Sequence, residues 1–236
     1  MLDIKLRWYT SIKEIKEADW KRVTREEVLP FFQWNWLNSL ETSRSIINKN
    51  GWQPLFLTAW NENCMVGFAP LYLKSHSYGE FVFDNIFSEL AFNLGLNYYP
   101  KIVGMSPLSP IEGYRFFFSP EQNETELTIL MINAIDNFAE ENNILSANFL
   151  YVDHNWKKSA EAANCLPWIN QKSLYTVKDE ENFSEYLKRF NSNQRKNIKK
   201  ERKILREAGI DFYTKSGKEL NSKDMILMYD LYEKHC

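Results

Sequence analysis

The segment KSHSYGEFVFD, residues 74–84, carries a dense set of polar, titratable and aromatic side chains directly after a predicted strand. His76, Glu80 and Asp84 are candidates for a general base, because imidazole and carboxylate groups are common proton acceptors in enzymes. Lys74 could bind an anionic group of a substrate. The sequence therefore indicates chemistry in this segment before any other.

A purely structural interpretation of the same segment is also open, and composition alone favours it. His76 and Glu80 would make hydrogen bonds within a turn, and Asp84 would cap a helix that begins at Asn85 or just after it. Further candidate substrate contacts, which fit a core as well as a cleft, are Tyr78, Tyr98, Tyr99 and Lys101.

Several other kinds of site lack their motifs. The chain has neither GxxxxGK[ST] nor GxGxxG, so it lacks the usual nucleotide-binding loops, and it has no GxSxG nucleophile elbow. Only His76, Glu80 and Asp84 approach the spacing of metal ligands. On a strand, that spacing places the side chains on one face but far apart, so no metal site is expected.

The composition is that of an ordinary globular protein. The 236 residues include 25% charged and 44% hydrophobic residues, with a high aromatic content of 15%. Cys64, Cys165 and Cys236 have no CxxC or CxxH spacing, so neither a disulfide framework nor a zinc site is expected. No apolar run approaches about 18 residues, and no signal-peptide region is present, so we expect a cytoplasmic location.

A second candidate site is the basic segment NSNQRKNIKKERKILREAGI, residues 191–210. Residues 191–206 hold seven basic side chains against a single acid, in a chain whose formal net charge is -2. Asn191 and Gln194 predict a capping box at the start of a helix, and Gly209 predicts its end. The local surplus of charge indicates a polyanionic partner, and a solvated surface helix is the alternative.

Hydrophobic periodicity and turn residues predict the remaining elements. Strands are expected at residues 2–9, 54–60, 65–73, 146–152, 168–177 and 210–214. Helices are expected at residues 11–23, 30–43, 85–94, 124–142, 154–163, 183–190 and 224–234, the last without a cap. This order, with a hairpin turn at residues 61–63, predicts a mixed α/β (α+β) fold with a largely antiparallel central sheet flanked by helices.

Two passages together resemble a known family. The first runs GWQPLFLTAW…APLYLKSHSYGEFVFD…LNYYPKI, and the second is NQRKNIKKERKILREAGI. They are similar to the FemAB-like family of predicted bacterial N-acyltransferases, often labelled peptidoglycan biosynthesis or recognition proteins. The resemblance spans Phe31 to the C-terminus. It implies a GNAT-like acyltransferase fold, which the family uses twice in tandem.

The resemblance also implies a division into three parts. These are a first GNAT-like domain at residues 1–190, a basic connecting helix at residues 191–209, and the start of a second GNAT-like domain at residues 210–236. The chain would then be C-terminally truncated, which leaves its own catalytic competence open. The GNAT pyrophosphate loop [RQ]xxGx[GA] is absent, and this weakens the case for an acetyl-CoA donor.

The function implied is transfer of an acyl or aminoacyl group to an amine, for example of a peptidoglycan precursor. The donor would be a cosubstrate, aminoacyl-tRNA or acyl-CoA, with no permanently bound cofactor. The acceptor would be a small-molecule or lipid-linked amine, with no DNA partner and a place at the inner membrane surface.

Residue roles follow from the same resemblance. Glu80 or His76 would accept the amine proton, and Lys74 and Lys101 would orient anionic groups. Arg195, Asn197, Ile198 and Gly209 resemble the Fem pattern R-x-N-I…G, in a segment about one helical turn longer. The remaining substrate-binding candidates are Tyr78, Asp84, Tyr98, Tyr99, Gln194, Arg195, Asn197, Lys199 and Arg202.

A non-catalytic module is the competing interpretation. It would bind RNA or a cell-wall precursor through the basic helix. Steep salt dependence of binding without acyl transfer would favour this module, whereas a strong effect of substitutions in residues 74–84 on turnover would favour the enzyme.

Overall fold

The computed structural model describes residues 4–24, 28–171, 173–174, 176 and 182–235. The chain divides into two compact units, residues 1–169 and residues 170–236. Each unit is described by itself below. The domain boundary that we expect at residue 190 stays a prediction.

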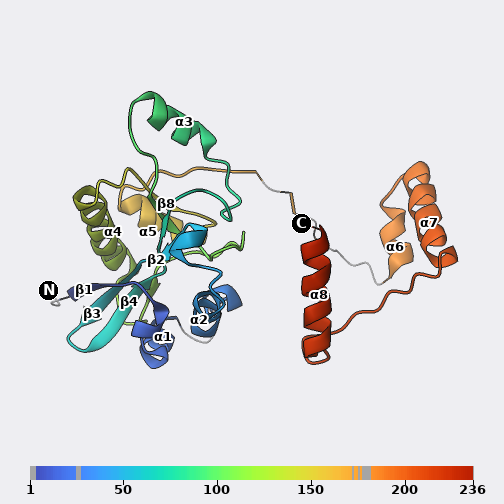
Figure 1. The fold of residues 1–236 in the computed structure, drawn as a ribbon, viewed down its shortest axis with the longest axis horizontal. Helices are drawn as coiled ribbons and strands as arrows, with labels where there is room; N and C mark the ends of the chain where they lie inside the picture. Colours follow the sequence, from blue (N-terminus) through green and yellow to red (C-terminus); the bar gives the residue numbers. More distant parts are fainter. Residues whose placement is uncertain (1–3, 25–27, 172, 175, 177–181, 236) are drawn as a thin grey trace. The chain divides into compact units, whose positions relative to one another are not determined.

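The first unit contains two four-stranded sheets (Figure 1). One sheet has the strand order β1-β3-β4-β7, with antiparallel pairs throughout, and the other has the order β2-β5-β6-β8, in which β6 and β8 run parallel. The strands are β1 (Ile4–Tyr9), β2 (Trp52–Pro54), β3 (Phe56–Asn61), β4 (Cys64–Ala69), β5 (Tyr72–Lys74), β6 (Lys101–Gly104), β7 (Phe117–Phe118) and β8 (Ala147–Phe149). The mixed α/β fold class with mainly antiparallel strands is therefore confirmed.

The predicted hairpin is the centre of the first sheet. β3 and β4 are joined by a tight turn in which Asn61 pairs with Cys64, and Glu62 takes a positive φ of 54°. β3 is buried along almost its whole length, whereas β1 alternates between exposed and half-buried positions because it lies at the sheet edge.

Each of the two predicted hairpin strands is divided between the two sheets: the first run contains the end of β2 and then β3, and the second contains β4 and then β5. The single central sheet that we expected is therefore two sheets. The chain leaves β2 and enters β3 across Leu55, and it leaves β4 and enters β5 across Pro70 and Leu71. The Leu55 N–H still donates to the Leu71 carbonyl at 2.9 Å. Proline lacks a backbone N–H, so the ladder is interrupted at Pro70.

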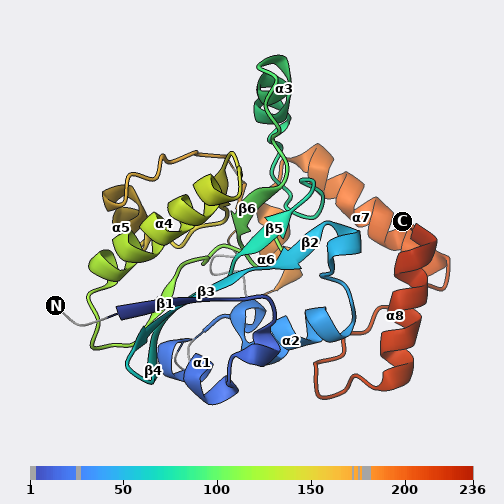
Figure 2. The same ribbon diagram turned by 60° about the vertical axis from the view of Figure 1, so that its left-hand side comes forward.

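Helices cover the two sheets from opposite sides, with α4 and α5 on one side and α1 and α2 on the other (Figure 2). The helices of this unit are α1 (Glu17–Thr24), α2 (Trp34–Thr42), α3 (Asn85–Asn93), α4 (Glu124–Glu141) and α5 (Lys157–Ala162), with short 3-10 helices η1 (Ile12–Glu14), η2 (Pro30–Phe32) and η3 (Asn48–Asn50). Trp8 of β1 packs against Phe138 of α4, with 4.7 Å between ring centroids.

Aromatic side chains dominate the core between these layers. Tyr114 is fully buried, its hydroxyl donates to the Pro70 carbonyl at 3.0 Å, and its ring lies within 6.1 Å of Phe32, Phe149 and Trp156. Such rings bury large areas, and here Tyr114 meets Trp156 edge to face, Phe149 in a stacked arrangement and Phe32 at a tilt. Most of the aromatic side chains therefore belong to the core or pack against it.

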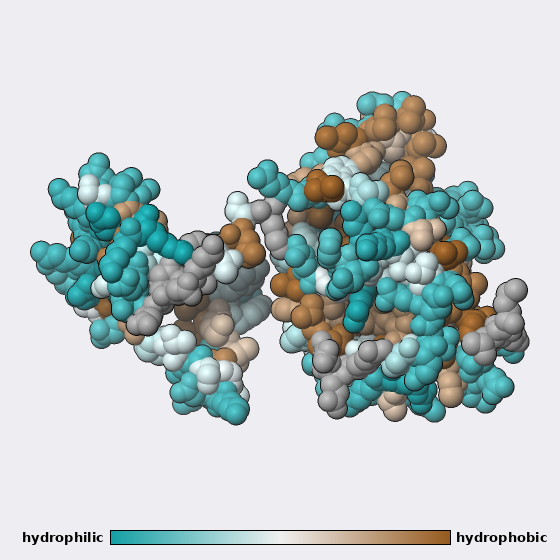
Figure 3. Space-filling view, turned by 180° about the vertical axis from the view of Figure 1, so that it is seen from behind, coloured by the Kyte–Doolittle hydropathy of each residue, from teal (hydrophilic) through white to brown (hydrophobic). Residues whose placement is uncertain are grey.

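The segment of residues 75–100 leaves the second sheet between β5 and β6 and carries α3. Figure 2 shows α3 standing away from the strands, and Figure 3 shows hydrophobic side chains gathered over it. The exposed apolar residues on and beside this helix are Phe83, Ile86, Phe87, Leu90, Phe92 and Leu94. Phe87 contacts Trp168 edge to face, with 4.5 Å between ring centroids.

The second unit contains α6 (Phe183–Lys188), α7 (Ser192–Glu207) and α8 (Ser222–His235). α7 has both of its predicted ends. Asn191 and Gln194 form the capping box, and the Gly209 and Ile210 N–H groups donate to the Arg206 and Leu205 carbonyls. Among the described residues, no helix combines the length and the apolar character needed to cross a membrane.

Two predicted strands are wrong. The described residues of 168–177, which leave out 172, 175 and 177, have no strand pairing, and neither has the range 210–214. The described residues of both ranges are exposed, and among the described residues no neighbouring strand supplies the hydrogen bonds that a short apolar run needs to become a strand. The range 146–152 shrinks to β8, which is half-buried rather than buried.

Some predicted helices are also divided or capped differently. Residues 11–23 split into η1 and α1 because Ile15 is extended, and its carbonyl accepts the Trp34 indole N–H at 2.9 Å. Ser11 caps η1, where its side chain accepts the Lys13 N–H. α8 does have a cap, because the Asn221 side chain accepts from the Lys223 and Asp224 N–H groups.

Candidate functional site

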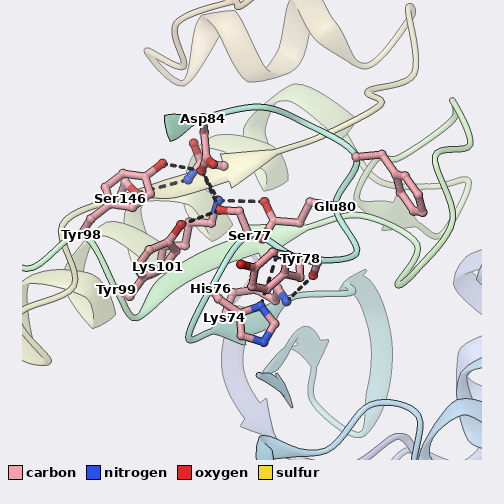
Figure 4. A network of polar contacts seen from close by, with 12 residues as sticks. Lys74, His76, Ser77, Tyr78, Glu80, Asp84, Tyr98, Tyr99, Lys101 and Ser146 are labelled. Carbon is pink, nitrogen blue, oxygen red and sulfur yellow. Dashed lines mark hydrogen bonds and ion pairs between the residues drawn. The ribbon is translucent and has the colours of Figure 1, made fainter. Parts of the chain in front are cut away.

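The residues that the sequence singled out meet where β5 ends and β6 begins. Lys74 and Lys101 are direct partners across these two strands. The segment that leaves the sheet between them folds back over the strand ends and brings its own polar side chains to the lysines (Figure 4). Two like charges placed opposite one another on a sheet repel, so this point needs compensating groups.

Lys101 is compensated by two carboxylates. Its Nζ lies 2.7 Å from Glu80 Oε2 and 2.5 Å from Asp84 Oδ2. Lys101 is 1% exposed, Glu80 is fully buried and Asp84 is 5% exposed. Buried charges are tolerated when they are paired and hydrogen-bonded, and the Lys101 ammonium meets that condition.

Asp84 Oδ2 receives further hydrogen bonds from two hydroxyls. Tyr98 donates at 2.8 Å and Ser77 donates at 2.9 Å. Because the Ser77 proton points to Asp84, the Tyr99 hydroxyl at 2.8 Å donates to Ser77 Oγ. Burial raises the pKa of Asp84, but the hydrogen bonds from Lys101, Tyr98 and Ser77 outweigh it and leave the pKa below its usual value. Asp84 is therefore held as a carboxylate.

For Glu80 the effect of burial on the pKa outweighs that of the hydrogen bond, the reverse of Asp84. Burial raises its pKa above the usual value, although the hydrogen bond from Lys101 works against the shift. Its Oε1 has no hydrogen-bond partner among the described residues, and the same is true of Asp84 Oδ1. Each carboxylate thus keeps one oxygen free to accept a hydrogen bond or a proton. A carboxylate with a raised pKa and a free oxygen is the usual form of a carboxylate general base.

Lys74 lies apart from the carboxylates. Its Nζ donates to the Tyr78 carbonyl at 3.0 Å and sits 3.7 Å from the centroid of the Trp52 ring. The residue is fully buried, and burial lowers its pKa to about 8, with Lys101 adding to the shift and Glu80 opposing it. Trp52 reaches this position because it pairs with Lys74 across β2 and β5.

His76 belongs to the turn rather than to the carboxylate cluster. Its Nδ1 accepts the Tyr78 N–H at 3.2 Å, so in the neutral ring the proton lies on Nε2. A side chain at Gly51 would approach His76 Nε2 to 2.1 Å, so the ring lies directly on the Gly51 backbone. Burial and Lys74 lower the pKa of His76.

The structure joins five of the predicted residues and leaves Lys74, His76 and Tyr78 outside their network. Lys101, Glu80, Asp84, Tyr98 and Tyr99 form a single network. His76 makes a turn hydrogen bond, as the structural interpretation predicts. That interpretation is wrong for Asp84, whose side chain makes no capping hydrogen bond to α3 and faces Lys101 instead.

Three residues of the site were not predicted from the sequence. Ser77 links Asp84 to Tyr99, Trp52 covers Lys74, and the Tyr151 hydroxyl donates to the Glu80 and Phe81 carbonyls at 3.1 and 3.0 Å. Ser77 stands within the marked segment and could have been included. Trp52 comes from β2 and Tyr151 from the segment that follows β8, and only the tertiary structure reveals them.

The basic helix carries the remaining predicted residues. Gln194 is exposed and is used in the capping box, and Asn197, Lys199 and Arg202 are exposed on α7. Arg195 is half-buried, and its guanidinium donates to the Phe190 carbonyl. Within the described ranges, no three His, Cys, Asp or Glu side chains gather as metal ligands.

A family profile covers nearly the whole chain. The profile of the FemAB-like family, described as peptidoglycan biosynthesis/recognition, matches residues 11–236. No curated protein matches the sequence. The chain belongs to the FemAB-like family.

Solved structures that are similar to this chain include N-acetyltransferases. The ribosomal-protein-alanine N-acetyltransferase of Brucella melitensis biovar Abortus 2308 is 9% identical, with a TM-score of 0.38 over 74% of this chain and 98% of its own. The aminoglycoside N-acetyltransferase AAC(6')-Iy, solved with CoA, is 10% identical, with a TM-score of 0.42 over 75% and 94%. AAC(6')-Ih of Acinetobacter baumannii is 9% identical, with a TM-score of 0.40 over 75% and 99%.

Proposed function

We propose that this protein is an N-acyltransferase that moves an acyl or aminoacyl group to an amine of a peptidoglycan precursor. Membership of the FemAB-like family supports the reaction class and the pathway. The assignment of Glu80 as the base rests on the geometry of its side chain. Glu80 is fully buried, one carboxylate oxygen pairs with Lys101, and the other oxygen has no partner among the described residues.

In the proposed reaction the amine nitrogen of the acceptor attacks the acyl carbon of the donor. The N–C bond forms as the N–H proton passes to Glu80 Oε1. The bond to the leaving oxygen of an aminoacyl ester, or to the leaving sulfur of a thioester, then breaks, and the leaving group takes up a proton. Burial favours this role, because the raised pKa makes Glu80 a stronger base than an exposed carboxylate.

Lys101 and Asp84 would act as positioning residues. Lys101 holds Glu80 Oε2 at 2.7 Å and so fixes the direction of the free Oε1. Asp84, kept ionised by three donors, balances the charge of Lys101 when Glu80 takes up a proton. Positioning of reactants in this manner supplies much of the rate enhancement where no covalent intermediate forms.

Glu80 is fully buried, so an acceptor could reach its Oε1 only after movement of the turn of residues 77–83, which carries Glu80 itself. Within this turn Tyr78 is 81% exposed and Phe81 has a positive φ of 59°. The acceptor would displace this turn on binding, as substrates do with lid segments in many enzymes. His76, at the start of the turn, is the second candidate base and is tested beside Glu80.

Transfer of radiolabelled acyl groups tests the proposal. Aminoacyl-tRNAs and acyl-CoAs would be offered as donors with peptidoglycan precursor as acceptor. Glu80→Gln should lower the rate by about 10²–10³-fold, whereas His76→Gln should have little effect. Glu89→Gln, on exposed α3, is the matched control and should transfer as the wild type does. The wild-type rate should fall as the pH drops through the raised pKa of Glu80.

The competing function, a binding module, also has an observation in its favour. Lys101 neutralises carboxylate charge inside the network, so the cluster could serve only to fasten residues 75–100 to the sheet. Full transfer by Glu80→Gln would remove Glu80 as the base. No transfer by the wild type from any donor, together with salt-sensitive binding of RNA or precursor, would favour the binding module.

A further inference from the structure

The hairpin of α6 and α7 encloses an open groove of about 450 Å³. The groove is lined by Ser184, Leu187, Lys188, Arg195 and Lys199. Three of these five side chains are cations, one is a hydroxyl and none is an acid. The groove belongs wholly to the second unit and shares no residue with the Lys101 network.

Contacts between the two helices hold the groove in shape. Leu187 is buried between them, and the Arg202 guanidinium lies 3.9 Å from the centroid of the Phe183 ring. The Arg195 guanidinium donates to the Phe190 carbonyl at the bend between the helices. This contact holds Arg195 in position, and among the described residues it uses only one nitrogen of the guanidinium, which has five N–H donors in all.

The charges around the groove are not balanced. Lys199 has no carboxylate partner among the described residues, and Lys188 is paired on the surface with Glu185 at 2.7 Å. Over its length α7 carries seven basic residues against Glu201 and Glu207, and Glu207 is already shared with Lys203. A concave site with uncompensated cations attracts an anion.

The mixture of donors indicates which anion. A guanidinium fork, two ammonium groups and a serine hydroxyl match the tetrahedral oxygens of a phosphate, which accept several hydrogen bonds at once. The groove, at about 450 Å³, is also larger than one phosphate needs. A chain of phosphates fits this layout better than a lone carboxylate.

We propose that the groove between α6 and α7 binds phosphate groups of the acyl donor, through Arg195, Lys199, Lys188 and Ser184. The identification of the ligand as the donor rests on the proposed function; the binding of phosphate does not. The phosphates could be the diphosphate of a coenzyme A thioester or the backbone of an aminoacyl-tRNA, and the two sources differ only in what is attached to the shared group.

Binding is measured on the full chain by calorimetric titration, with no acceptor present. The probes are inorganic diphosphate, coenzyme A and deacylated tRNA. Arg195→Ala with Lys199→Ala should weaken binding by about tenfold or more. The matched control, Lys196→Ala with Lys200→Ala, removes the same charge from the same helix outside the groove and should weaken binding less than about threefold.

A second pair of substitutions guards against loss of the hairpin, because Arg195 also supports the Phe190 carbonyl. Lys188→Gln with Lys199→Gln leaves that contact intact and should also weaken binding by about tenfold. Circular dichroism checks that the helices persist. Preference for coenzyme A or for tRNA identifies the source of the phosphates, and diphosphate should compete with either.

Two results would overturn the site: equal weakening by the groove pair and the control pair, or no binding of any probe by the wild type. Because no acceptor is present, failure of acyl transfer does not affect this outcome. If the groove variants still transfer acyl groups at the wild-type rate, the proposed function stands, but the donor does not bind in this groove.

Discussion

Lys74 and Lys101 are direct partners across β5 and β6, yet their charges are met in different ways. Lys101 is held by two carboxylates, whereas Lys74 has one backbone carbonyl and the face of an indole ring. One lysine is therefore the centre of an ion-pair network, and the other has its pKa lowered to about 8 by burial. Predictions for stability and titration follow from this asymmetry.

Lys101→Met should destabilise the protein strongly. It leaves Glu80 and Asp84 buried without their cation, and breaking a buried pair from one side costs about 3–5 kcal/mol. Urea denaturation at neutral pH measures the loss. Adding Glu80→Gln and Asp84→Asn to the same variant should restore part of it, because no unpaired charge then remains. A loss below about 1 kcal/mol would show that the network is not buried in solution.

The two neighbouring tyrosines offer a matched comparison. Tyr98→Phe removes a hydrogen bond to the ionised Asp84 and should cost about 1.5–3 kcal/mol, whereas Tyr99→Phe removes a hydrogen bond to Ser77 and should cost about 1 kcal/mol. Denaturant midpoints of the two variants measure the difference. Equal costs would mean that Asp84 gains nothing from Tyr98.

The pH dependence of the Tyr98→Phe variant has a definite sign. The folded pKa of Asp84 lies below its usual value, so its contribution to stability is present above the unfolded pKa and is lost as the pH falls through the folded pKa. Tyr98→Phe weakens that contribution. The stability difference between wild type and variant should therefore be largest near neutral pH and shrink below about pH 4.

Local sequence pattern was sufficient to mark the segment of the site but not its connections. Residues 74–84 are unusual in composition, and the β3–β4 hairpin is encoded by its turn, so both could be predicted. The pairing of Asp84 with Lys101 depends on the register of β5 with β6, which no local pattern specifies. Asp84 also has the form of a helix cap, so local chemistry favoured the wrong partner.

The same limit explains the division of the sheet. A run such as residues 65–73 shows strand periodicity throughout, and only the tertiary structure decides that it changes sheets at Pro70. By contrast, the ends of α7 are set by the side chains of Asn191 and Gln194 and by the positive φ of Gly209, all within one turn of the helix end. Those ends were predicted correctly.

Gly51→Ala should displace His76. Gly51 has a φ of +72°, and a Cβ there would lie 2.1 Å from His76 Nε2. Gly95 is the matched control, with a φ of +70° and no atom within 4 Å of an added Cβ. Gly95→Ala should cost about 1–2 kcal/mol from backbone strain alone, and Gly51→Ala should cost more.

Combining Gly51→Ala with His76→Ala separates strain from steric clash. If the ring is the obstacle, the double variant should return to the cost of Gly95→Ala, as measured by urea denaturation. Histidine NMR signals of Gly51→Ala should also shift, because the hydrogen bond from the Tyr78 N–H to the His76 ring is lost. An unchanged His76 signal would contradict the proposed contact.

Lys74→Met tests the lowered pKa directly through the stability of the fold. The folded pKa is about 8 and the usual value is 10.5, so between these limits the unfolded chain binds a proton that the folded chain does not. The stability contributed by this group therefore rises with pH over this window. Methionine keeps the length of the side chain but has no such titration.

The stability of the wild type relative to Lys74→Met should accordingly rise by about 1 kcal/mol between pH 8 and pH 9, since each unit of proton linkage is worth about 1.4 kcal/mol at most. Urea denaturation of both proteins at the two pH values gives the result. Lys158→Met, on the exposed surface of α5, is the control and should show no such change. If the two lysine variants behave alike, Lys74 is solvated, and its burial beneath Trp52 does not hold in solution.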